Sequence, residues 1–200
     1  MDVVETLVPG AVVVTPRQFS DDRGTFLEWY RFEPLEEVVG RRLDLRQANI
    51  SVSRRGVFRG LHFAAVPPGQ AKYVTVSAGA AIDFFVDVRV GSPTYGRWDS
   101  VLLDTVDRRA VFIAEGLAHG FLALEDDTTL TYLVNDVYRP GQEHGIDPMD
   151  PAIGLDIPDS IGIPLLSAKD AAAPSLEEAE RAGLLPTWDD CVARYAADAR

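Results

Sequence analysis

The chain has 200 residues, and its 19 Lys and Arg against 31 Asp and Glu give a formal net charge of −12. A balance this acidic argues against nonspecific binding to nucleic acid, which depends on clustered positive charge. Hydrophobic residues make up 46% and charged residues 25%, so the composition excludes a wholly disordered chain and allows a sizeable core.

Short runs rich in Val, Ile, Phe, Tyr and Thr dominate the chain from about residue 11 to residue 138, and Gly, Pro and Asp separate them. This spacing is typical of an all-β sandwich or barrel. We expect strands at 12–15, 25–32, 48–53, 72–76, 82–88, 101–103, 110–113 and 130–134.

Helical periodicity is confined to short segments, at 34–39, 175–184 and 187–197. The last two open with capping patterns, Ser175-x-x-Glu178 and Thr187-x-x-Asp190. No linker or repeat divides the chain, so we expect one domain over 1–200, with a β core at about 11–138 and a helical tail at about 175–200.

Cys191 is the only cysteine, and it shares a predicted helix face with Trp188, Val192 and Tyr195. We therefore interpret it as a packing residue rather than a nucleophile. A single cysteine, together with an amino terminus that lacks a basic region or a long apolar run, predicts a soluble cytoplasmic protein without membrane contact.

Strict alternation marks the segment 47–53, where Gln47, Asn49, Ser51 and Ser53 share one face of a strand and apolar residues share the other. A solvated outer face is the commoner interpretation for an antiparallel sheet. A polar interior that holds a ligand is the alternative. Alternation by itself favours the solvated face.

Arginine is concentrated at residues 41–59, which hold six arginines and a single acid, Asp44. The first hundred residues are neutral overall, so the whole excess of negative charge lies in the second half. A small anionic ligand such as a diphosphate suits a patch of this size, because Arg binds phosphate oxygens in pairs. For Arg41 and Arg42 we prefer pairing with the nearby Glu36 and Glu37.

The chain contains three histidines, His62, His119 and His144, and no His-x-His pair of the kind a metal-binding cupin normally shows. The sequence therefore predicts no metal site. An isolated histidine in a strand is more often structural than catalytic, so these residues carry little weight alone.

An ordered series of short motifs gives two of these histidines, His62 and His119, a functional interpretation. They are Asp22-Arg23-Gly24-x-Phe26-x-Glu28, Gln47-x-Asn49-x-Ser51-x-Ser53, Gly56-Val57-x-Arg59-Gly60-Leu61-His62, Gln70-x-Lys72, Gly91-Ser92-Pro93-Thr94-Tyr95-Gly96-x-Trp98, Ala118-His119-Gly120-Phe121, Tyr132, and Leu166-Ser167-x-Lys169-Asp170. Together they resemble the dTDP-4-dehydrorhamnose 3,5-epimerase family from about Arg17 to Leu185.

The resemblance implies a cupin-like jelly roll that acts as a homodimer, without metal or other cofactor. Its reaction inverts carbons beside the C4 ketone of a dTDP-4-keto-6-deoxyhexose by removing and returning a proton. The resemblance implies that His62 is the base and that Asp170 is the carboxylate that orients His62. It also implies that Lys72 stabilises charge on the C4 oxygen and that Tyr132 is the acid. An exposed edge strand near the amino terminus would offer a dimer surface.

The resemblance also implies substrate contacts. Arg23, Arg59 and His119 match diphosphate and sugar contacts, while Glu28, Gln47, Asn49, Glu143 and Lys169 match other nucleotide and pocket contacts. Either Tyr138 or Phe26 would stack on the thymine. With these roles, the polar face of 47–53 turns inward.

Arg59 and His62 have opposite parity along a strand, so both reach one pocket only if the chain bulges between them. We expect this irregularity at Gly60, and a regular strand over 57–63 would refute it.

Several functions remain open. The family includes enzymes that invert C3 alone or C5 alone with the same catalytic set, in rhamnose or antibiotic pathways, and the loop Val66-Pro67-Pro68-Gly69 departs from many relatives. A metal-dependent cupin isomerase or oxygenase and a non-catalytic nucleotide-sugar binding protein are further alternatives.

Overall fold

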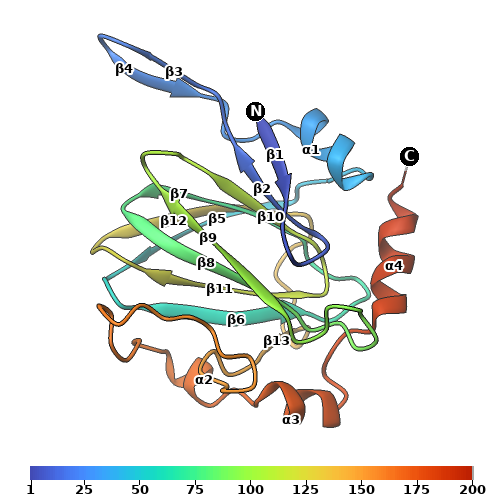
Figure 1. Ribbon diagram of the computed structural model, residues 1–200. Coiled ribbons are helices and arrows are strands. Elements are labelled where there is room, and N and C mark those ends of the chain that lie inside the picture. The colour runs from blue at the N-terminus through green and yellow to red at the C-terminus, as the bar shows by residue number, and fades with distance from the viewer. Residues whose placement is uncertain (200) are drawn as a thin grey trace.

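Two antiparallel β-sheets packed face to face form the body of the computed structural model, which describes residues 1–199 (Figure 1). The six-stranded sheet has the order β1 (Asp2–Glu5), β2 (Ala11–Thr15), β10 (Ala110–Ile113), β7 (Lys72–Ala78), β12 (Thr128–Val134) and β5 (Gln47–Ser53). The five-stranded sheet has the order β13 (Glu143–Gly145), β6 (Phe58–Ala64), β11 (Leu117–Ala123), β8 (Ala80–Asp87) and β9 (Trp98–Asp104). The predicted all-β, cupin-like sandwich is confirmed.

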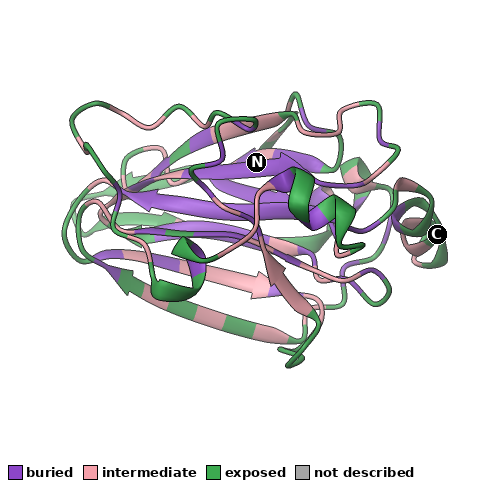
Figure 2. Ribbon diagram, turned by 90° about the horizontal axis from the view of Figure 1, so that it is seen from below, coloured by how far each residue is buried: buried purple, intermediate pink, exposed green. Residues whose placement is uncertain are grey.

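The inner faces of both sheets are apolar over most of their area. Val74 and Leu130 of one sheet pack against Phe85 and Phe121 of the other, because alternate residues of each strand point into the space between the sheets. Figure 2 shows the buried strands gathered in the middle of the molecule. This core supports one end of the inter-sheet space, and a cavity occupies the other.

Separate apolar layers cover part of the outer face of each sheet. On the six-stranded sheet, Leu35 of α1 (Phe32–Val39) packs near Tyr73 and Phe112. Below the five-stranded sheet, Leu176 of α3 (Leu176–Arg181) packs near Phe84. The C-terminal segment also supplies α2 (Ala168–Ala171) and α4 (Trp188–Ala197), and no helix among residues 1–199 has the length and apolar character needed to cross a membrane.

Both predicted helix caps are present. Ser175 and Glu178 form a reciprocal capping box, and the Thr187 side chain accepts a hydrogen bond from the Asp190 N–H. Cys191 is fully buried, and burial raises the pKa of its thiol to about 12, which fits a packing role. Val192 differs from the prediction, since it lies on the exposed side of α4.

A hairpin of β3 (Gln18–Asp21) and β4 (Gly24–Leu27) projects away from the sandwich (Figure 1). The predicted strand over 25–32 is therefore wrong after Leu27. Trp29 and Tyr30 turn back to pack on Tyr73, with ring centroids 5.7 and 5.1 Å from it, and the Tyr73 hydroxyl donates to the Trp29 carbonyl at 2.7 Å. Burial of these rings outweighs the strand propensity of the segment.

The predicted bulge is present in β6. His62 pairs with His119 and Arg59 pairs with Phe121, so three steps along β6 match two along β11. Gly60 has φ +130°, and a Cβ there would lie 2.5 Å from the Gly120 Cα. Glycine is required because the two backbones touch. The extra residue is what lets Arg59 and His62 line one cavity.

Candidate active site

A cavity of about 410 Å³ opens between the sheets beside the core. Phe121 and Leu130 belong to both the core and the cavity wall, so the cavity continues the apolar interior. The rest of the wall is polar or aromatic and comes from both sheets and adjoining loops: Gln47, Asn49, Ser51, Arg59, His62, Gln70, Lys72, His119, Tyr132, Tyr138 and Glu143.

The polar face of β5 turns into this cavity. Gln47 donates to Asn49 at 2.8 Å and accepts from the Tyr138 N–H at 3.1 Å, while Ile50 and Val52 on the other face are exposed. The commoner interpretation of the alternation, a solvated polar face, is therefore wrong. The strand buries its polar side chains because they line a cavity rather than a core.

His62 on β6 and Asp170 on α2 form a close pair. Nε2 of His62 lies 2.6 Å from Oδ1 of Asp170, and the Ser167 hydroxyl accepts a hydrogen bond from the Asp170 N–H at 3.1 Å. Burial lowers the pKa of His62 below its ordinary 6.5, although Asp170 acts in the opposite direction. The imidazole is therefore mainly neutral at pH 7, and Nδ1 is free to accept a proton.

Lys72 begins β7 and points its ammonium into the cavity. Burial lowers its pKa from 10.5 to about 8, and the negative charge of Glu143 opposes that shift. Nζ donates a hydrogen bond to Oε1 of Gln70 at 2.8 Å. Lys72 thus remains mainly cationic at neutral pH inside a partly desolvated cavity.

Tyr132 on β12 shares the inner face of the six-stranded sheet with Lys72, because β12 and β7 are paired neighbours. Burial first, and then Glu143, raise the pKa of its phenol above 10, while Arg59 acts in the opposite direction. The phenol therefore stays protonated at neutral pH. It faces the His62 side of the cavity from the opposing sheet.

His119 on β11 is held by a buried acid that the sequence reasoning missed. Its Nε2 lies 2.8 Å from Oδ2 of Asp83 on β8, and Asp83 is fully buried with its other oxygen unpaired. Burial raises the pKa of Asp83, and His119 opposes the rise. Asp83 and Asp87 interrupt the apolar run at 82–88, and such acids were the available signal, because an acid buried in a strand needs a partner.

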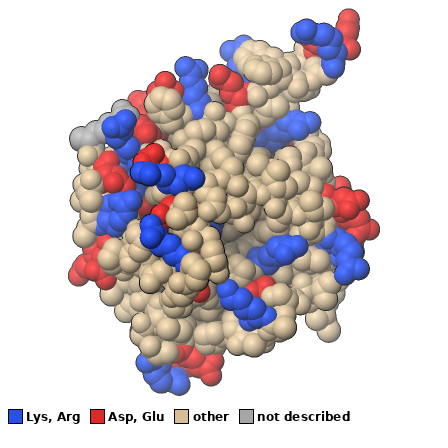
Figure 3. All heavy atoms as spheres, turned by 180° about the vertical axis from the view of Figure 1, so that it is seen from behind, with Lys and Arg blue, Asp and Glu red and all other residues tan. Residues whose placement is uncertain are grey.

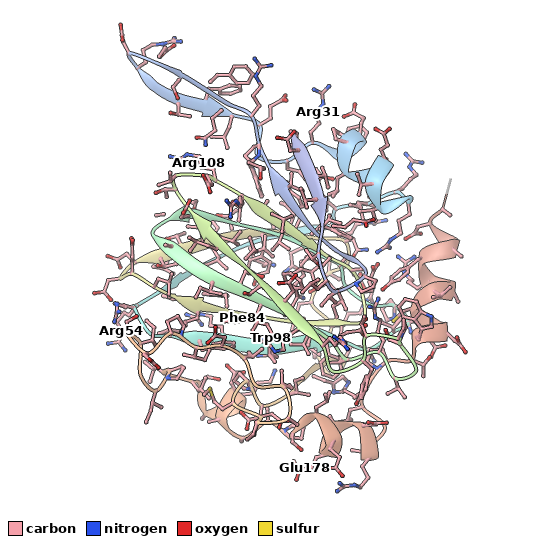
Figure 4. The ribbon with its side chains drawn as sticks, viewed as in Figure 1. Arg31, Arg54, Phe84, Trp98, Arg108 and Glu178 are labelled. Carbon is pink, nitrogen blue, oxygen red and sulfur yellow. The ribbon has the colours of Figure 1, made fainter. Side chains whose placement is uncertain are left out.

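The arginine cluster at 41–59 does not act as one patch. Arg59 lines the cavity, with Nε donating to the Ser53 hydroxyl at 3.0 Å and Nη2 to the Val52 carbonyl at 3.2 Å. Arg41 forms a buried ion pair with Glu115, a partner that the sequence did not predict. Arg54 lies at the rim of the molecule (Figure 4).

Some predicted residues lie outside the cavity. Arg23, at the hairpin turn, is exposed and pairs with Asp21, while Glu28 pairs with Arg31 at 3.6 Å. Phe26 is exposed on the same hairpin, so Tyr138 is the candidate aromatic that lines the cavity. Figure 3 shows acidic and basic side chains together at the hairpin tip.

Lys169 lines an adjoining cleft of about 330 Å³ that also borders Arg59, His62 and Asp170. A larger hollow of about 970 Å³ lies near α1 and the end of α4, and none of the predicted site residues lines it. Its arginines are largely neutralised, as in the Arg139–Asp136 and Arg194–Asp198 pairs. Within residues 1–199 no cluster of three or more His, Cys, Asp or Glu has metal-binding geometry.

Comparison with known proteins gives close matches. A sequence model of dTDP-4-dehydrorhamnose 3,5-epimerase matches residues 5–178. A dTDP-4-dehydrorhamnose 3-epimerase of Streptomyces niveus is 53% identical over 186 residues, which are 93% of this chain and 89% of that one. A dTDP-4-dehydrorhamnose 3,5-epimerase of Mycolicibacterium smegmatis is 52% identical over 193 residues, which are 96% and 94% of the two chains.

Solved structures agree with these relatives. The rmlC epimerase of Mycobacterium tuberculosis superposes with a TM-score of 0.96 at 50% identity, covering 99% of this chain and all of that one. ChmJ, a 3′-monoepimerase of Streptomyces bikiniensis solved with dTDP-quinovose, gives a TM-score of 0.93 at 43% identity, with 98% of each chain covered. With these likenesses spanning nearly its whole length, the chain belongs to the dTDP-4-dehydrorhamnose 3,5-epimerase family.

Proposed function

We propose that this protein is an epimerase of a dTDP-4-keto-6-deoxyhexose, inverting C3, C5 or both beside the C4 ketone. One observation carries the proposal. A neutral His62 paired with Asp170 and a protonated Tyr132 enter one cavity from opposing sheets, with the Lys72 ammonium at the same cavity. Inversion needs a base and an acid on opposite faces of the sugar ring, and this arrangement supplies both.

The reaction follows from these groups. His62 takes the proton from the carbon next to the ketone, and the carboxylate of Asp170 stabilises the imidazolium that results. Lys72 offsets the negative charge that moves onto the C4 oxygen, and a cation counts for more here than in water because the cavity is partly desolvated. Tyr132 then returns a proton to the opposite face.

The rest of the cavity suits recognition of the nucleotide. Arg59, His119 and Tyr138 line the cavity, where Arg59 and His119 would contact the diphosphate and sugar and Tyr138 would stack on the thymine. Gln47, Asn49 and Glu143 provide polar contacts along the same wall. Lys169 would contact the substrate from the adjoining cleft. The related ChmJ holds dTDP-quinovose, which supports a dTDP-sugar as the ligand.

Two relatives with nearly equal sequence identity to this chain are named for different reactions. The Streptomyces niveus protein is named a 3-epimerase and the Mycolicibacterium smegmatis protein a 3,5-epimerase. Inversion at C3 alone is therefore the second candidate. Both reactions need the same base, cation and acid, so the outcome depends on whether Tyr132 reaches one carbon or two as the ring turns.

We also propose that the protein works as a cytoplasmic homodimer, with its substrate site completed by the partner. Arg23 and Glu28 lie on or beside a hairpin that points away from the cavity of their own chain. If they contact substrate, they reach the cavity of a second protomer. The exposed Ile50 and Val52 on β5 and Phe26 on the hairpin provide apolar surface for that contact.

The decisive test is incubation with dTDP-4-keto-6-deoxyglucose in D₂O with EDTA, followed by NMR of the recovered sugar. Deuterium at C3 and C5 supports double inversion, and deuterium at one carbon selects a mono-epimerase. A parallel reaction omits EDTA. Binding of dTDP with no exchange in either reaction would indicate a binding protein, and exchange only without EDTA would indicate a metal enzyme.

Two variants assign the roles. His62→Ala should reduce exchange at both carbons by roughly 10²–10⁴-fold, the usual contribution of a general base. Tyr132→Phe should still permit exchange, because the base remains, but should impair inversion. Full activity of the His62 variant would disprove its role as the base.

A further inference from the structure

The strongest unassigned feature of the cavity is the hydrogen-bonded group around Gln70. Gln70 precedes β7 by two residues and follows the loop Val66-Pro67-Pro68-Gly69. Its Oε1 accepts a hydrogen bond from Nζ of Lys72 at 2.8 Å, and its Nε2 donates to the Asp136 carbonyl at 3.0 Å. One amide therefore touches both the ammonium of Lys72 and the backbone of the 135–138 loop.

The two contacts fix which way the amide points. A flipped amide would place its NH₂ against the ammonium, two donors together, and its oxygen against the Asp136 carbonyl, two acceptors together. Both hydrogen bonds would be lost in that orientation. The Asp136 carbonyl thus orients Gln70, and the oriented oxygen holds the ammonium.

The loop that carries Asp136 is itself anchored. Asn135 accepts from the Ala71 N–H at 2.7 Å and donates to Oε1 of Glu115 at 2.8 Å. Glu115 is fully buried and paired with Arg41. The backbone beside the Asp136 carbonyl is therefore anchored to the protein interior through Asn135 and the buried Arg41–Glu115 pair, in addition to the exposed Arg139–Asp136 pair.

From this geometry we propose that Gln70 is a positioning residue of the epimerase, which keeps the Lys72 ammonium charged and aimed at the C4 oxygen. The inference rests on the proposed function, since it gives a purpose to the position of Lys72. A hydrogen bond accepted from an ammonium favours its charged form, whereas an apolar neighbour of the same length does not.

The other groups that face Lys72 across the cavity come from several elements. They are Glu143 on β13, Tyr132 on β12, Arg59 and His62 on β6, His119 on β11 and Tyr138 in the loop. Of these, Glu143 favours the charged form of Lys72. These groups stay unchanged when Gln70 alone is replaced, so a shift in the titration of Lys72 reports on the amide.

The chain offers a direct measurement, because Lys72 and Lys169 are its only lysines. Labelling with ¹³C-lysine gives two side-chain Cε signals, and Lys169→Arg assigns them. Titration by NMR then follows the protonation of Lys72 without substrate. We compare the wild type with Gln70→Met, which removes the acceptor at equal length, and Gln70→Glu, which adds charge. Gln142→Met is the matched control, a glutamine outside the catalytic cavity.

We expect the midpoint of Lys72 to fall by about one pH unit in Gln70→Met, the equivalent of one hydrogen bond to a charged group, and to rise in Gln70→Glu. The alkaline limb of deuterium exchange should move in the same order. Unchanged midpoints in both variants would overturn the inference. So would a rise in Gln70→Met, which would show that water entry rather than the amide governs Lys72.

The titration also separates the two levels of the proposal. Absence of exchange in the wild type would refute the epimerase function, whatever the lysine signals show. Exchange with unchanged lysine signals in both Gln70 variants would refute only the role of Gln70. If Gln70→Met does not fold by circular dichroism, Gln70→Glu decides by whether its midpoint rises.

Discussion

His62 and Lys72 must hold opposite protonation states in one cavity, and burial lowers the pKa of both. The base must be neutral and the cation charged, so the working window lies between the two pKa values. We predict a bell-shaped profile of kcat/KM, with an acidic limb below pH 6.5 and an alkaline limb near pH 8. Initial rates between pH 5 and 10 test both limbs.

Lys72→Arg is the control for the alkaline limb. Arginine stays charged throughout this range, so the limb near pH 8 should disappear even though the bulkier side chain lowers the rate. An alkaline limb that remains near pH 8 in this variant would assign it to another group and contradict the role given to Lys72.

The charge of Lys72 also has a cost in stability. Because its pKa falls from 10.5 to about 8 on folding, the native state disfavours the ammonium at pH 7 by up to about 3 kcal/mol. Lys72→Met should therefore raise the free energy of unfolding while abolishing activity. In the wild type, the free energy of unfolding should rise between about pH 8 and 10.5, where Lys72 binds a proton in the unfolded chain but not in the folded one. The gap in unfolding free energy between Lys72→Met and the wild type should therefore narrow over this range.

Urea unfolding at pH 7 and at pH 10 measures this difference. Lys169→Met is the matched control, because Lys169 is exposed and its substitution should change stability little. Equal stability of wild type and Lys72→Met at both pH values would show that folding does not desolvate the Lys72 ammonium.

At the scale of elements, the contact of β6 with β11 decides where the catalytic side chains point. Gly60→Ala adds a methyl group 2.5 Å from the Gly120 Cα at a residue with φ +130°. We expect a loss of roughly 2 kcal/mol or more in unfolding free energy, beyond the cost of positive φ alone. Activity should fall further still, because the bulge orients His62 and Arg59.

Gly162→Ala is the matched control for this change. Gly162 also has positive φ, at +68°, but nothing lies within 4 Å of its added Cβ, so about 1 kcal/mol is expected. Urea unfolding of both variants, beside exchange assays, isolates the backbone contact. Similar losses for the two glycines would show that β6 and β11 separate easily.

Some secondary-structure elements can be predicted from the sequence and others cannot. β-Branched runs predict most of the strands because local propensity and burial agree there. The opposite parity of Arg59 and His62 predicts the bulge, because two residues needed in one pocket constrain the backbone between them. The end of the strand at Leu27 escapes prediction, since it depends on Trp29 and Tyr30 meeting Tyr73 more than 40 residues later.

The residues of the candidate site also fall into two groups, those that sequence motifs predict and those that only the folded structure reveals. His62, Lys72 and Tyr132 are found through their motifs, and the structure brings them to one cavity. Asp83 and the contact of Gln70 with the Asp136 carbonyl depend on strand pairing and loop position. A linear pattern does not encode such contacts, because each partner is ordinary in its own segment.

At the scale of the whole molecule, the exposed outer side of β5 bears on assembly. Ile50 and Val52 are 69% and 55% exposed, and Phe26 on the hairpin is 67% exposed. If the proposed homodimer forms through this surface, the wild type should be a dimer by light scattering and Ile50→Arg a monomer, without unfolding a chain in which this side chain is already exposed. An unchanged dimer would place the interface elsewhere, for example at the edge strand β1.

The role of the hairpin is testable by mixing two inactive proteins. If Arg23 acts in the partner's cavity, a heterodimer of an Arg23→Ala protomer and a His62→Ala protomer contains one site with both residues intact. Random exchange of subunits in an equal mixture makes about half of the dimers mixed, so about a quarter of all sites should become active. Activity no greater than the sum of the two separate variants would show that Arg23 serves its own chain or no site at all. Recovery of activity would demonstrate that the partner protomer completes the cavity between the two sheets.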